Sequence, residues 1–490
     1  AEIVVFERSG YISYANCGLP YYIGGTIADK SALTLQTPES FRARFNVDMR
    51  VRHEVEAIDA ARHVVTVRNL ETDEPYDKLI LSPGARPTRP ALPGVGLDRL
   101  FTLRTVEDAF AMREFIDAES PRSAVVCGGG FIGLEEAENL RELGLDVTIV
   151  QRPRHLMNPF DADAAALIHQ EMRAHGVHLA LGRSVEGFEE RDGGIDVLVA
   201  GEEPLRADMV VLAIGVTPDT ALAETAGLET GIKGSIVVND RMETGIEDIY
   251  AVGDAVQVSH LVTGDDALIS LAGPANKQGR AAADVICGLN SRFAGAQGTS
   301  VIKVFDLTAA ATGLSEAACE RAGIAHDAVV LSPMSHAGYY PGGKVMTLKV
   351  VFERETYRLL GAQAIGYEGV DKRIDVLATA LFAGLSAIQL KDLDLAYAPP
   401  YSSAKDPVNM AGFMVENLAL GLVSQYRWDE VADLPRDGSV QLIDIRTPAE
   451  FERGALPGFR NIPLDELRER LGELDPALPV RLVCQSGLRS

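Results

Sequence analysis

The chain has 490 residues, of which 47% are hydrophobic and 24% charged, a composition typical of a folded protein with about three domains of ~150 residues. Forty-six basic against seventy acidic residues give a formal net charge of -24, which repels phosphates and excludes nucleic-acid binding. No apolar run reaches the ~18 residues of a membrane-spanning helix and no signal peptide opens the chain, so we expect a cytoplasmic protein without a membrane contact.

The apolar pattern at residues 2–7 predicts a buried parallel strand, which ends in Glu7 and is followed by Arg8. This is how the second strand of a dinucleotide-binding unit ends, ~20 residues after a GxGxxG loop. No such loop precedes it, so we expect the first strand, its glycine loop and its helix to be missing. The last residues, 484–490, form a loop that should lead into a helix, so the sequence predicts a fragment at both ends.

Strand-like runs at residues 123–127, 146–150, 209–213 and 248–252 alternate with helical patterns, which predicts an α/β fold with parallel sheets. A linker at 295–298 precedes a segment that mixes a strand at 345–352 with a helix at 371–383. The five cysteines are few, odd in number and scattered, which excludes a disulfide framework and a zinc ligand set. We expect Cys127, Cys287 and Cys319 to be core residues. The histidines show no metal-ligand spacing, so no metal site is predicted.

A nucleotide fingerprint follows the strand at 123–127. Gly128, Gly130 and Gly133 form GxGxxG between that strand and a helical pattern at 134–143. Gly128 permits the tight turn, Gly130 lets the backbone approach a pyrophosphate, and Gly133 lets helix and strand pack closely. The motif predicts an NAD(P) site.

The next strand ends in Gln151 and Arg152, where an NAD-specific site would place an acid for the ribose 2′-hydroxyl. A neutral residue followed by an arginine suits a 2′-phosphate better, which favours NADPH over NADH. Arg152 as a solvated surface residue is the equal alternative.

Three further segments resemble the pyridine nucleotide-disulfide oxidoreductase family: 81–87 with Pro83 and Gly84, 244–254 with Gly253 and Asp254, and 272–276 with Ala272 and Gly273. The resemblance implies FAD, with the Asp254 carboxylate on its ribityl hydroxyls. It also implies that the helix after Ala272 aims its N-terminus at the flavin, where amide dipoles stabilise negative charge.

The redox cysteine is a single one. Residues 13–25 carry Cys17 after Asn16, without the CxxxxC pair of many family members, and resemble the single-cysteine branch of coenzyme A-disulfide reductases, NADH oxidases and persulfide reductases. A thiol at a helix N-terminus has a lowered pKa, so Cys17 is the candidate nucleophile; an inert buried cysteine is the alternative. A thiol without a resolving partner pairs with an external small thiol or is oxidised to sulfenic acid.

Residues 336–342 and 396–407 also match the coenzyme A-disulfide branch. The resemblance implies a homodimer in which two tyrosines of the partner subunit, here Tyr339 and Tyr397, reach the cysteine and donate a proton to a leaving CoA thiolate. Core or interface aromatics are the alternative. By position, Asn16, Tyr401 and Lys405 become candidate substrate-binding residues.

Residues 440–490 resemble a rhodanese domain. The loop from Cys484 to Arg489 matches its CxxGxR active loop, in which backbone N–H groups ring a thiolate or persulfide sulfur and Arg489 adds a fixed charge. Ala455 stands where the family usually has histidine, and the missing helix after Ser490 leaves open whether the loop closes. A degenerate, purely structural unit is the alternative.

Together these patterns predict an α/β chain with two Rossmann-like dinucleotide-binding domains, an α+β dimerisation domain and a truncated α/β rhodanese domain. The expected bounds are 1–117 and 243–297 for the FAD domain, 118–242 for the NAD(P) domain, 298–425 for the dimerisation domain and 434–490 for the rhodanese domain. The implied enzyme is an FAD-dependent NAD(P)H reductase of CoA-disulfide, CoA-persulfide or polysulfide. Two alternatives remain: an NADH oxidase or peroxidase that cycles Cys17 through sulfenic acid, and a sulfane-sulfur carrier that acts through Cys484.

Overall fold

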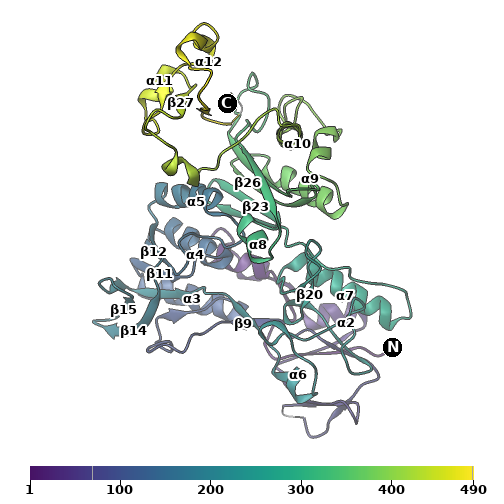
Figure 1. The fold of residues 1–490 in the computed structure, drawn as a ribbon. Coiled ribbons are helices and arrows are strands. Elements are labelled where there is room, and N and C mark those ends of the chain that lie inside the picture. Colours follow the sequence, from purple (N-terminus) through teal and green to yellow (C-terminus); the bar gives the residue numbers. More distant parts are fainter. Residues whose placement is uncertain (69, 488) are drawn as a thin grey trace. The chain divides into compact units, whose positions relative to one another are not determined.

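A computed structural model describes residues 1–68, 70–487 and 489–490. The chain forms two compact units, Ala1–Asn158 with Ala165–Phe305 and Pro159–Ala164 with Asp306–Ser490 (Figure 1). Among the described residues, none of the helices has both the length and the apolar character needed to cross a membrane.

The first unit contains a five-stranded parallel sheet whose neighbouring strands are β10, β17, β11, β12 and β13. Their bounds are Leu100–Phe101, Met209–Leu212, Ser123–Cys127, Asp146–Gln151 and His178–Leu181. Strands β11 and β17 are almost wholly buried and consist mainly of apolar residues, with two valines in each, as parallel strands covered on both faces do. Helix α4 (Phe131–Glu142) leaves the carboxyl end of β11, so the predicted strand, glycine loop and helix follow one another.

A second sheet covers part of this one. Strands β14 (Val185–Arg191), β15 (Gly194–Val199) and β16 (Leu205–Ala207) are antiparallel, and they share an apolar core with the parallel sheet. That core brings Phe188 and Val197 against Val125 and Val210. Figure 1 shows β14 and β15 beside β11 and β12.

The rest of the first unit is built around a second apolar core, which includes Ile58, Leu81, Ile249 and Ala282. Its elements are β1 (Val4–Glu7), β2 (Ser13–Tyr14), α1 (Leu19–Ile23), β3 (Thr34–Gln36), α2 (Pro38–Phe45), β4 (Asp48–Val51), β5 (Val55–Asp59), β6 (Val64–Val67), β7 (Glu74–Pro75), β8 (Leu79–Leu81), β9 (Ala85–Pro87), α3 (Val106–Glu119), β18 (Val216–Pro218), α6 (Ala221–Thr225), β19 (Ile249–Ala251), β20 (Val258–Ser259), β21 (Asp266–Ala267), α7 (Ala272–Ile286) and β22 (Ser300–Val304).

The expectation that residues 2–7 are buried is wrong. Ile3 is 50% and Val5 37% exposed, and within the part of the chain that the structure describes β1 pairs only with β4, in parallel. The strand itself and its direction are as predicted.

The second unit is built on antiparallel strands β23 (Leu307–Gly313), β26 (Leu359–Gly366), β25 (Met346–Glu353) and β24 (His326–Leu331), paired in that order. Its helices are α8 (Glu316–Arg321), α9 (Val370–Phe382) and α10 (Pro407–Ala419), drawn in green in Figure 1. Helix α9 packs against β23 and β26, and α8 and α10 pack against β24. Helix α5 (Ala162–Ala174) begins in this unit and continues in the other.

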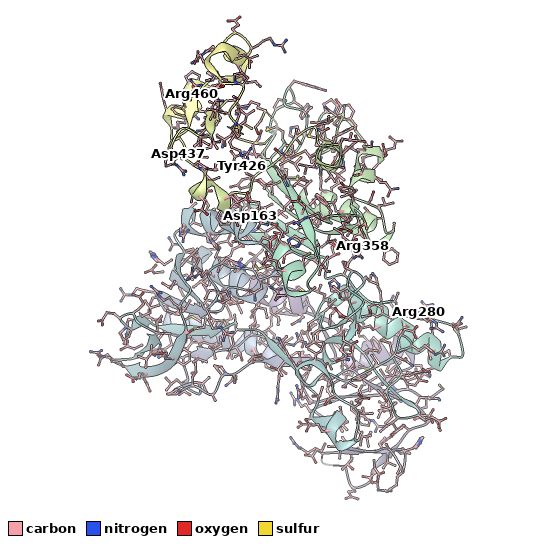
Figure 2. The ribbon with its side chains drawn as sticks, viewed as in Figure 1. Asp163, Arg280, Arg358, Tyr426, Asp437 and Arg460 are labelled. Atoms are coloured by element: carbon pink, nitrogen blue, oxygen red, sulfur yellow. The ribbon has the colours of Figure 1, made fainter. Side chains whose placement is uncertain are left out.

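The C-terminal part of this unit is a three-stranded parallel sheet in which β27 (Gln441–Asp444) lies between β28 (Arg460–Asn461) and β29 (Val480–Val483). Helices α11 (Pro448–Glu452) and α12 (Leu464–Leu467) accompany it. Ile443, Ile445 and Ile462 form its buried core. The Tyr426 hydroxyl, labelled in Figure 2 beside this segment, donates to the Leu482 carbonyl of β29 at 3.0 Å.

The cysteine expectations are met at two positions out of three. Cys127 and Cys319 are buried, as predicted, but Cys287 is exposed. The helical pattern that suggested a core position ends there, because Cys287 is the C-cap of α7.

Candidate active site

The glycine loop after β11 packs against backbone atoms at Gly128 and Gly133 and is open at Gly130. A Cβ atom on Gly128 would overlap the Ala213 carbonyl oxygen, and one on Gly133 would overlap the Gly128 carbonyl oxygen. Gly130, the N-cap of α4, has no atom within 4 Å of the place where its Cβ would lie. The residues behind the loop therefore require glycine, and the open side at Gly130 fits a pyrophosphate on the N-terminus of α4.

The side chains of Gln151 and Arg152, at the end of β12, differ in burial: the first is buried and the second is exposed. The buried Gln151 side chain accepts a hydrogen bond from the Gly129 N–H at 2.9 Å, so it supports the glycine loop from below. Arg152 is exposed. In this structure Arg152 is therefore the residue of the two that is free to meet a ligand charge.

The second cradle lies between β19 and α7. Gly253 has φ +82°. No atom lies within 4 Å of the position that a Cβ would take on Gly253 or on Gly273. Helix α7 begins after Leu271 without a side-chain cap and without an acid in its first turn, and the space beside Gly273 is open. The backbone N–H groups at the start of α7 fit the negatively charged parts of FAD.

Sequence reasoning missed Arg104, which lies just before α3. Its Nη2 donates to Asp254 at 2.9 Å, and the same atom lies 3.2 Å from the place of a Cβ on Gly84. It also lowers the pKa of Tyr14, although burial, which raises that pKa, has the larger effect. Arg104 therefore joins the Gly84 loop, Asp254 and the segment before Cys17, a partnership over 150 residues that no local pattern reveals.

Three other predicted cofactor residues flank this cradle. The Glu7 carboxylate accepts from the Ser9 N–H at 2.6 Å, which fixes the turn after β1. Arg8, 58% exposed, pairs with Asp219 at 3.0 Å. Pro83 lies between β8 and Gly84, whose φ is +72°.

Cys17 lies in a short 3-10 helix, Asn16–Gly18, directly before α1, and both Cys17 and Asn16 are exposed. Gly18 behind the thiol is closely packed, since a Cβ there would lie 3.2 Å from Ala15, Ile27 and Leu33. The thiol is therefore presented outward on a fixed turn.

Helix α4 carries acids that sequence reasoning also missed. Burial and then the neighbouring Glu138 raise the pKa of Glu135 to about 7, and burial and then Glu135 raise that of Glu136 to about 8. Burial, Glu135, Glu138 and, more weakly, Cys17 raise the pKa of Tyr21 to about 12. The helix after Cys17 therefore lies near Glu135, a carboxyl that holds its proton near neutral pH.

In the second unit, the structure brings Tyr339 and Tyr397 together. Their hydroxyl oxygens are 2.8 Å apart, although the residues are 58 positions apart in the chain. The rings are 76% and 46% exposed, so they are not core residues. The hydrogen bond with Tyr397 raises the pKa of Tyr339. Tyr401 and Lys405 are exposed further along the same loop.

The Cys484 loop is closed around the sulfur. Cys484 directly follows β29, and its Sγ accepts from the Gly487 N–H at 3.1 Å. Burial raises the thiol pKa, but the hydrogen bonds from Ser490, Ser486 and Arg489 outweigh it and lower the pKa below its usual value. Leu488 of this loop lies outside the described residues.

Arg489 is held by Glu450, a residue whose role sequence reasoning missed. The guanidinium donates two hydrogen bonds to the Glu450 carboxylate, at 2.9 and 2.7 Å, and these lower the Glu450 pKa to about 2. Glu450 also accepts from the Thr447 N–H in the capping box of α11, so the arginine is anchored to a helix start. Ala455 is exposed.

Comparisons with known proteins agree with this arrangement. Residues 1–279 match the family Pyridine nucleotide-disulphide oxidoreductase, residues 299–407 its dimerisation domain and residues 427–490 the Rhodanese-like domain. The coenzyme A disulfide reductase of Staphylococcus haemolyticus (strain JCSC1435) is 36% identical over 425 residues, 85% of this chain and 94% of that protein. The NAD(P)H sulfur oxidoreductase (CoA-dependent) of Pyrococcus abyssi is 36% identical over 83% of this chain and 91% of its own.

Solved structures extend the similarity to the C-terminus. The reduced CoADR-RHD of Bacillus anthracis superposes with a TM-score of 0.96 at 45% identity, covering 100% of this chain and 88% of that one. The NAD-dependent persulfide reductase of A. fulgidus gives 0.93 at 35% identity, with 100% and 90% covered. The chain therefore belongs to the pyridine nucleotide-disulphide oxidoreductase family. Its predicted α/β fold with dimerisation and rhodanese-like domains is confirmed.

Proposed function

We propose that this pyridine nucleotide-disulphide oxidoreductase reduces CoA-disulfide through Cys17. The balanced reaction takes one NAD(P)H, one proton and one CoA-disulfide to NAD(P)⁺ and two CoA thiols. The Cys17 thiolate attacks the substrate disulfide, so that a Cys17–CoA mixed disulfide forms and the first CoA thiolate leaves. Two electrons then cleave the mixed disulfide and release the second CoA. The curated relatives that are coenzyme A disulfide reductases support this substrate class.

The observation that carries the proposal is the exposed Cys17 thiol at the start of α1, in the unit that holds both nucleotide cradles. All five cysteines are free, and Cys127 is buried within β11. Because Cys17 forms no disulfide with any of the other four, its thiol needs an external sulfur partner, which CoA supplies.

The residues fit FAD and a nicotinamide nucleotide, as the family requires. FAD supplies the relay that turns the nicotinamide hydride into two electrons for a disulfide. We assign FAD to the second cradle and the nicotinamide nucleotide to the glycine loop. The FAD set is Glu7, Arg8, Pro83, Gly84, Gly253, Asp254, Ala272 and Gly273, and the NAD(P) set is Gly128, Gly130, Gly133, Gln151 and Arg152.

NADPH is the proposed reductant, because Arg152 is exposed at the end of β12 and position 151 holds a glutamine instead of an acid. A relative supports the charge argument. The water-forming NADH oxidase of Lactobacillus brevis, 29% identical with a TM-score of 0.83, was engineered to a form solved with NADPH. Its changes include aspartate to alanine followed by alanine to arginine.

The dimerisation-domain match supports a homodimer, and we propose that the Tyr339–Tyr397 pair acts at Cys17 of the partner subunit. A phenol whose oxygen already shares a hydrogen bond is a donor placed to protonate a leaving CoA thiolate. Asn16, Tyr401 and Lys405 are the proposed CoA contacts, since all three are exposed and polar.

A CoA persulfide is the second candidate substrate, favoured by the closed Cys484 loop with its lowered pKa. Its reduction takes one NAD(P)H and one proton to CoA thiol, hydrogen sulfide and NAD(P)⁺. The persulfide reductase among the similar structures supports this class.

The test is Cys17→Ser. Flavin reduction by NAD(P)H, followed by stopped-flow absorbance, should stay at the wild-type rate while CoA-disulfide turnover disappears, because hydride transfer precedes the sulfur chemistry. Turnover at the wild-type rate in this variant would make Cys17 structural and end the proposal. Rapid oxygen consumption with NAD(P)H alone, lost with Cys17, would identify an oxidase instead.

We also propose the domain bounds 1–117 with 243–297, 118–242, 298–425 and 434–490. Limited proteolysis with mass mapping tests them, since cleavage concentrates in exposed connections such as 426–438.

A further inference from the structure

One arginine is wholly buried in the second unit. Arg373 lies on α9, and its side chain is only 1% exposed. A buried guanidinium is stable only with an ionic partner and with its remaining donors satisfied. Asp406, at the N-cap of α10, provides that partner: Arg373 Nη2 and Nε donate to its two carboxylate oxygens at 2.9 and 3.3 Å.

The other donors of this guanidinium reach two separate loops. Nη2 lies 3.0 Å from the Ser335 carbonyl oxygen, 3.3 Å from that of Tyr401 and 3.1 Å from the Ser402 hydroxyl oxygen. Nη1 donates to the Gly369 carbonyl at 3.1 Å. One planar group therefore gathers the loop around residue 335 and the loop around residue 401 onto α9.

These are the loops of the tyrosine pair. Ser335 lies four residues before Tyr339, and Tyr401 lies four residues after Tyr397. A backbone hydrogen bond from Ala337 to Ser402, 3.0 Å long, joins the two loops directly. The neighbouring Lys372 donates to the carbonyl of Ala396, the residue before Tyr397, at 3.4 Å.

We propose that Arg373 is a positioning residue that holds the Tyr339 and Tyr397 hydroxyls within hydrogen-bond distance. Neither ring is held by burial, since both are largely exposed, so their separation depends on the backbone of the two loops. Arg373 fixes that backbone at the base of each loop. The inference deepens the proposed function, in which this phenol pair serves CoA-disulfide reduction.

The glycine before α9 supports the assignment. Gly369 has φ +68°, and a Cβ there would overlap Nη1 of Arg373. The chain therefore leaves out a side chain at the one place where it would displace the guanidinium. Ser402 serves the same arrangement, because its hydroxyl donates to Asp406 at 2.7 Å while it accepts from Arg373.

Arg373→Lys tests the inference, because lysine keeps the charge opposite Asp406 but cannot span both loops with a planar fork. Photo-oxidation that joins adjacent tyrosines as dityrosine, mapped by mass spectrometry, reports the Tyr339–Tyr397 separation without turnover. We expect the mapped link to decrease severalfold. Arg321→Lys, an exposed arginine on α8, is the matched control and should keep the wild-type yield.

Two activity measurements separate positioning from general damage. CoA-disulfide turnover in Arg373→Lys should fall roughly tenfold or more while flavin reduction by NAD(P)H is unchanged. The alkaline limb of its pH–rate profile should move to lower pH, because the hydrogen bond with Tyr397 that raises the Tyr339 pKa is weakened. In a Tyr339→Phe, Tyr397→Phe background, Arg373→Lys should cost nothing further.

An unchanged dityrosine link in folded Arg373→Lys, or an equal loss of turnover in the double-Phe background, would overturn the inference. A reduced link with wild-type turnover would uphold it and instead refute the phenols' part in the proposed function. If Arg373→Lys does not fold, Ser402→Ala removes one acceptor and must reduce the same link by a smaller factor for the inference to survive.

Discussion

The Arg104 guanidinium donates a 2.9 Å hydrogen bond to the carboxylate of Asp254, across 150 residues of sequence. Both side chains are about one-fifth exposed, so the pair is partly shielded from water. Asp254 is the residue assigned to the FAD ribityl chain, and Arg104 also lies beside Gly84. The geometry of the FAD cradle therefore depends on a residue outside every motif that identifies it.

We expect Arg104→Met to weaken FAD binding by about tenfold, which corresponds to the ~1.4 kcal/mol of a partly shielded charged hydrogen bond. Titration of the apoprotein with FAD, followed by flavin fluorescence, measures the effect. Arg62→Met, which removes an exposed arginine paired with Asp73, is the control and should leave the affinity unchanged. An equal affinity in both variants would remove Arg104 from the cradle.

The glycine loop and the rhodanese loop were predictable because their function is encoded in consecutive residues. Gly133 is required by the carbonyl oxygen of Gly128, five residues away, so this contact lies within the motif itself. Gly128 is in turn required by the carbonyl oxygen of Ala213, which only the fold brings there. The Cys484 sulfur similarly accepts a hydrogen bond from the N–H of Gly487, three residues away.

Residues that act through distant partners were not predictable in the same way. Arg104, Arg373 and Glu450 reach partners 150, 33 and 39 positions away, and only tertiary packing brings them there. Cys287 shows a related limit, because a helical period predicts the helix but does not show that the cysteine lies at its exposed end.

Glu136 makes stability depend on pH. Its carboxyl is fully buried, neither oxygen has a hydrogen-bond partner among the described residues, and burial raises its pKa from 4.5 to about 8. The unfolded chain releases this proton near pH 4.5 and the folded one only near pH 8. This stabilisation of the native state is therefore complete below pH 4.5 and is lost as the pH rises to 8, by roughly 5 kcal/mol in total.

Thermal unfolding at pH 5.5 and pH 8 of the wild type and Glu136→Gln measures this contribution. The decrease in unfolding temperature between the two pH values should be smaller in the variant, because glutamine does not titrate. Glu142→Gln, an exposed change on the same helix, should follow the wild type. Parallel pH dependences in all three proteins would contradict the shift.

Lys349 should be essential to the second unit. Its buried ammonium pairs with Asp161 at 3.1 Å, with Asp163 at 2.9 Å and with Glu316 (Asp163 is labelled in Figure 2). Lys349→Met leaves these carboxylates without their central cation, and we expect a loss of about 3–5 kcal/mol. Chemical denaturation measures it, with the exposed Lys344→Met as control. The loss should shrink in acid, where the carboxylates take up protons; a pH-independent loss would mean that packing, not charge, is responsible.

The Cys484 thiol should react as a thiolate at lower pH than an ordinary cysteine. Its hydrogen bonds from Ser490, Ser486 and Arg489 lower its pKa in the folded chain and are lost on unfolding. The rate of iodoacetamide labelling, mapped to Cys484 as a function of pH, should therefore have a lower midpoint in native protein than in concentrated guanidinium chloride. Coincident midpoints would show that the loop does not stabilise the thiolate.

Cys17 and Cys484 should both take part in the turnover of persulfide substrates, whereas the turnover of CoA-disulfide should not involve Cys484. A CoA persulfide held at Cys17 carries its sulfur on a long, flexible pantetheine arm, and such a tether raises the effective concentration of its tip at any second thiol within reach. The Cys484 thiol lies in a loop that closes around its sulfur and lowers its pKa, so it is suited to exchange that sulfur. CoA-disulfide needs only Cys17.

We therefore expect Cys484→Ala to slow turnover of persulfides or polysulfides at least several times more than turnover of CoA-disulfide, as measured by NAD(P)H oxidation with each substrate. Cys287→Ala, which removes an exposed thiol at the end of α7, is the matched control and should affect neither rate. Equal slowing with both substrates, or none with either, would mean that the reductase and the rhodanese-like domain act independently and that the fusion only keeps them together.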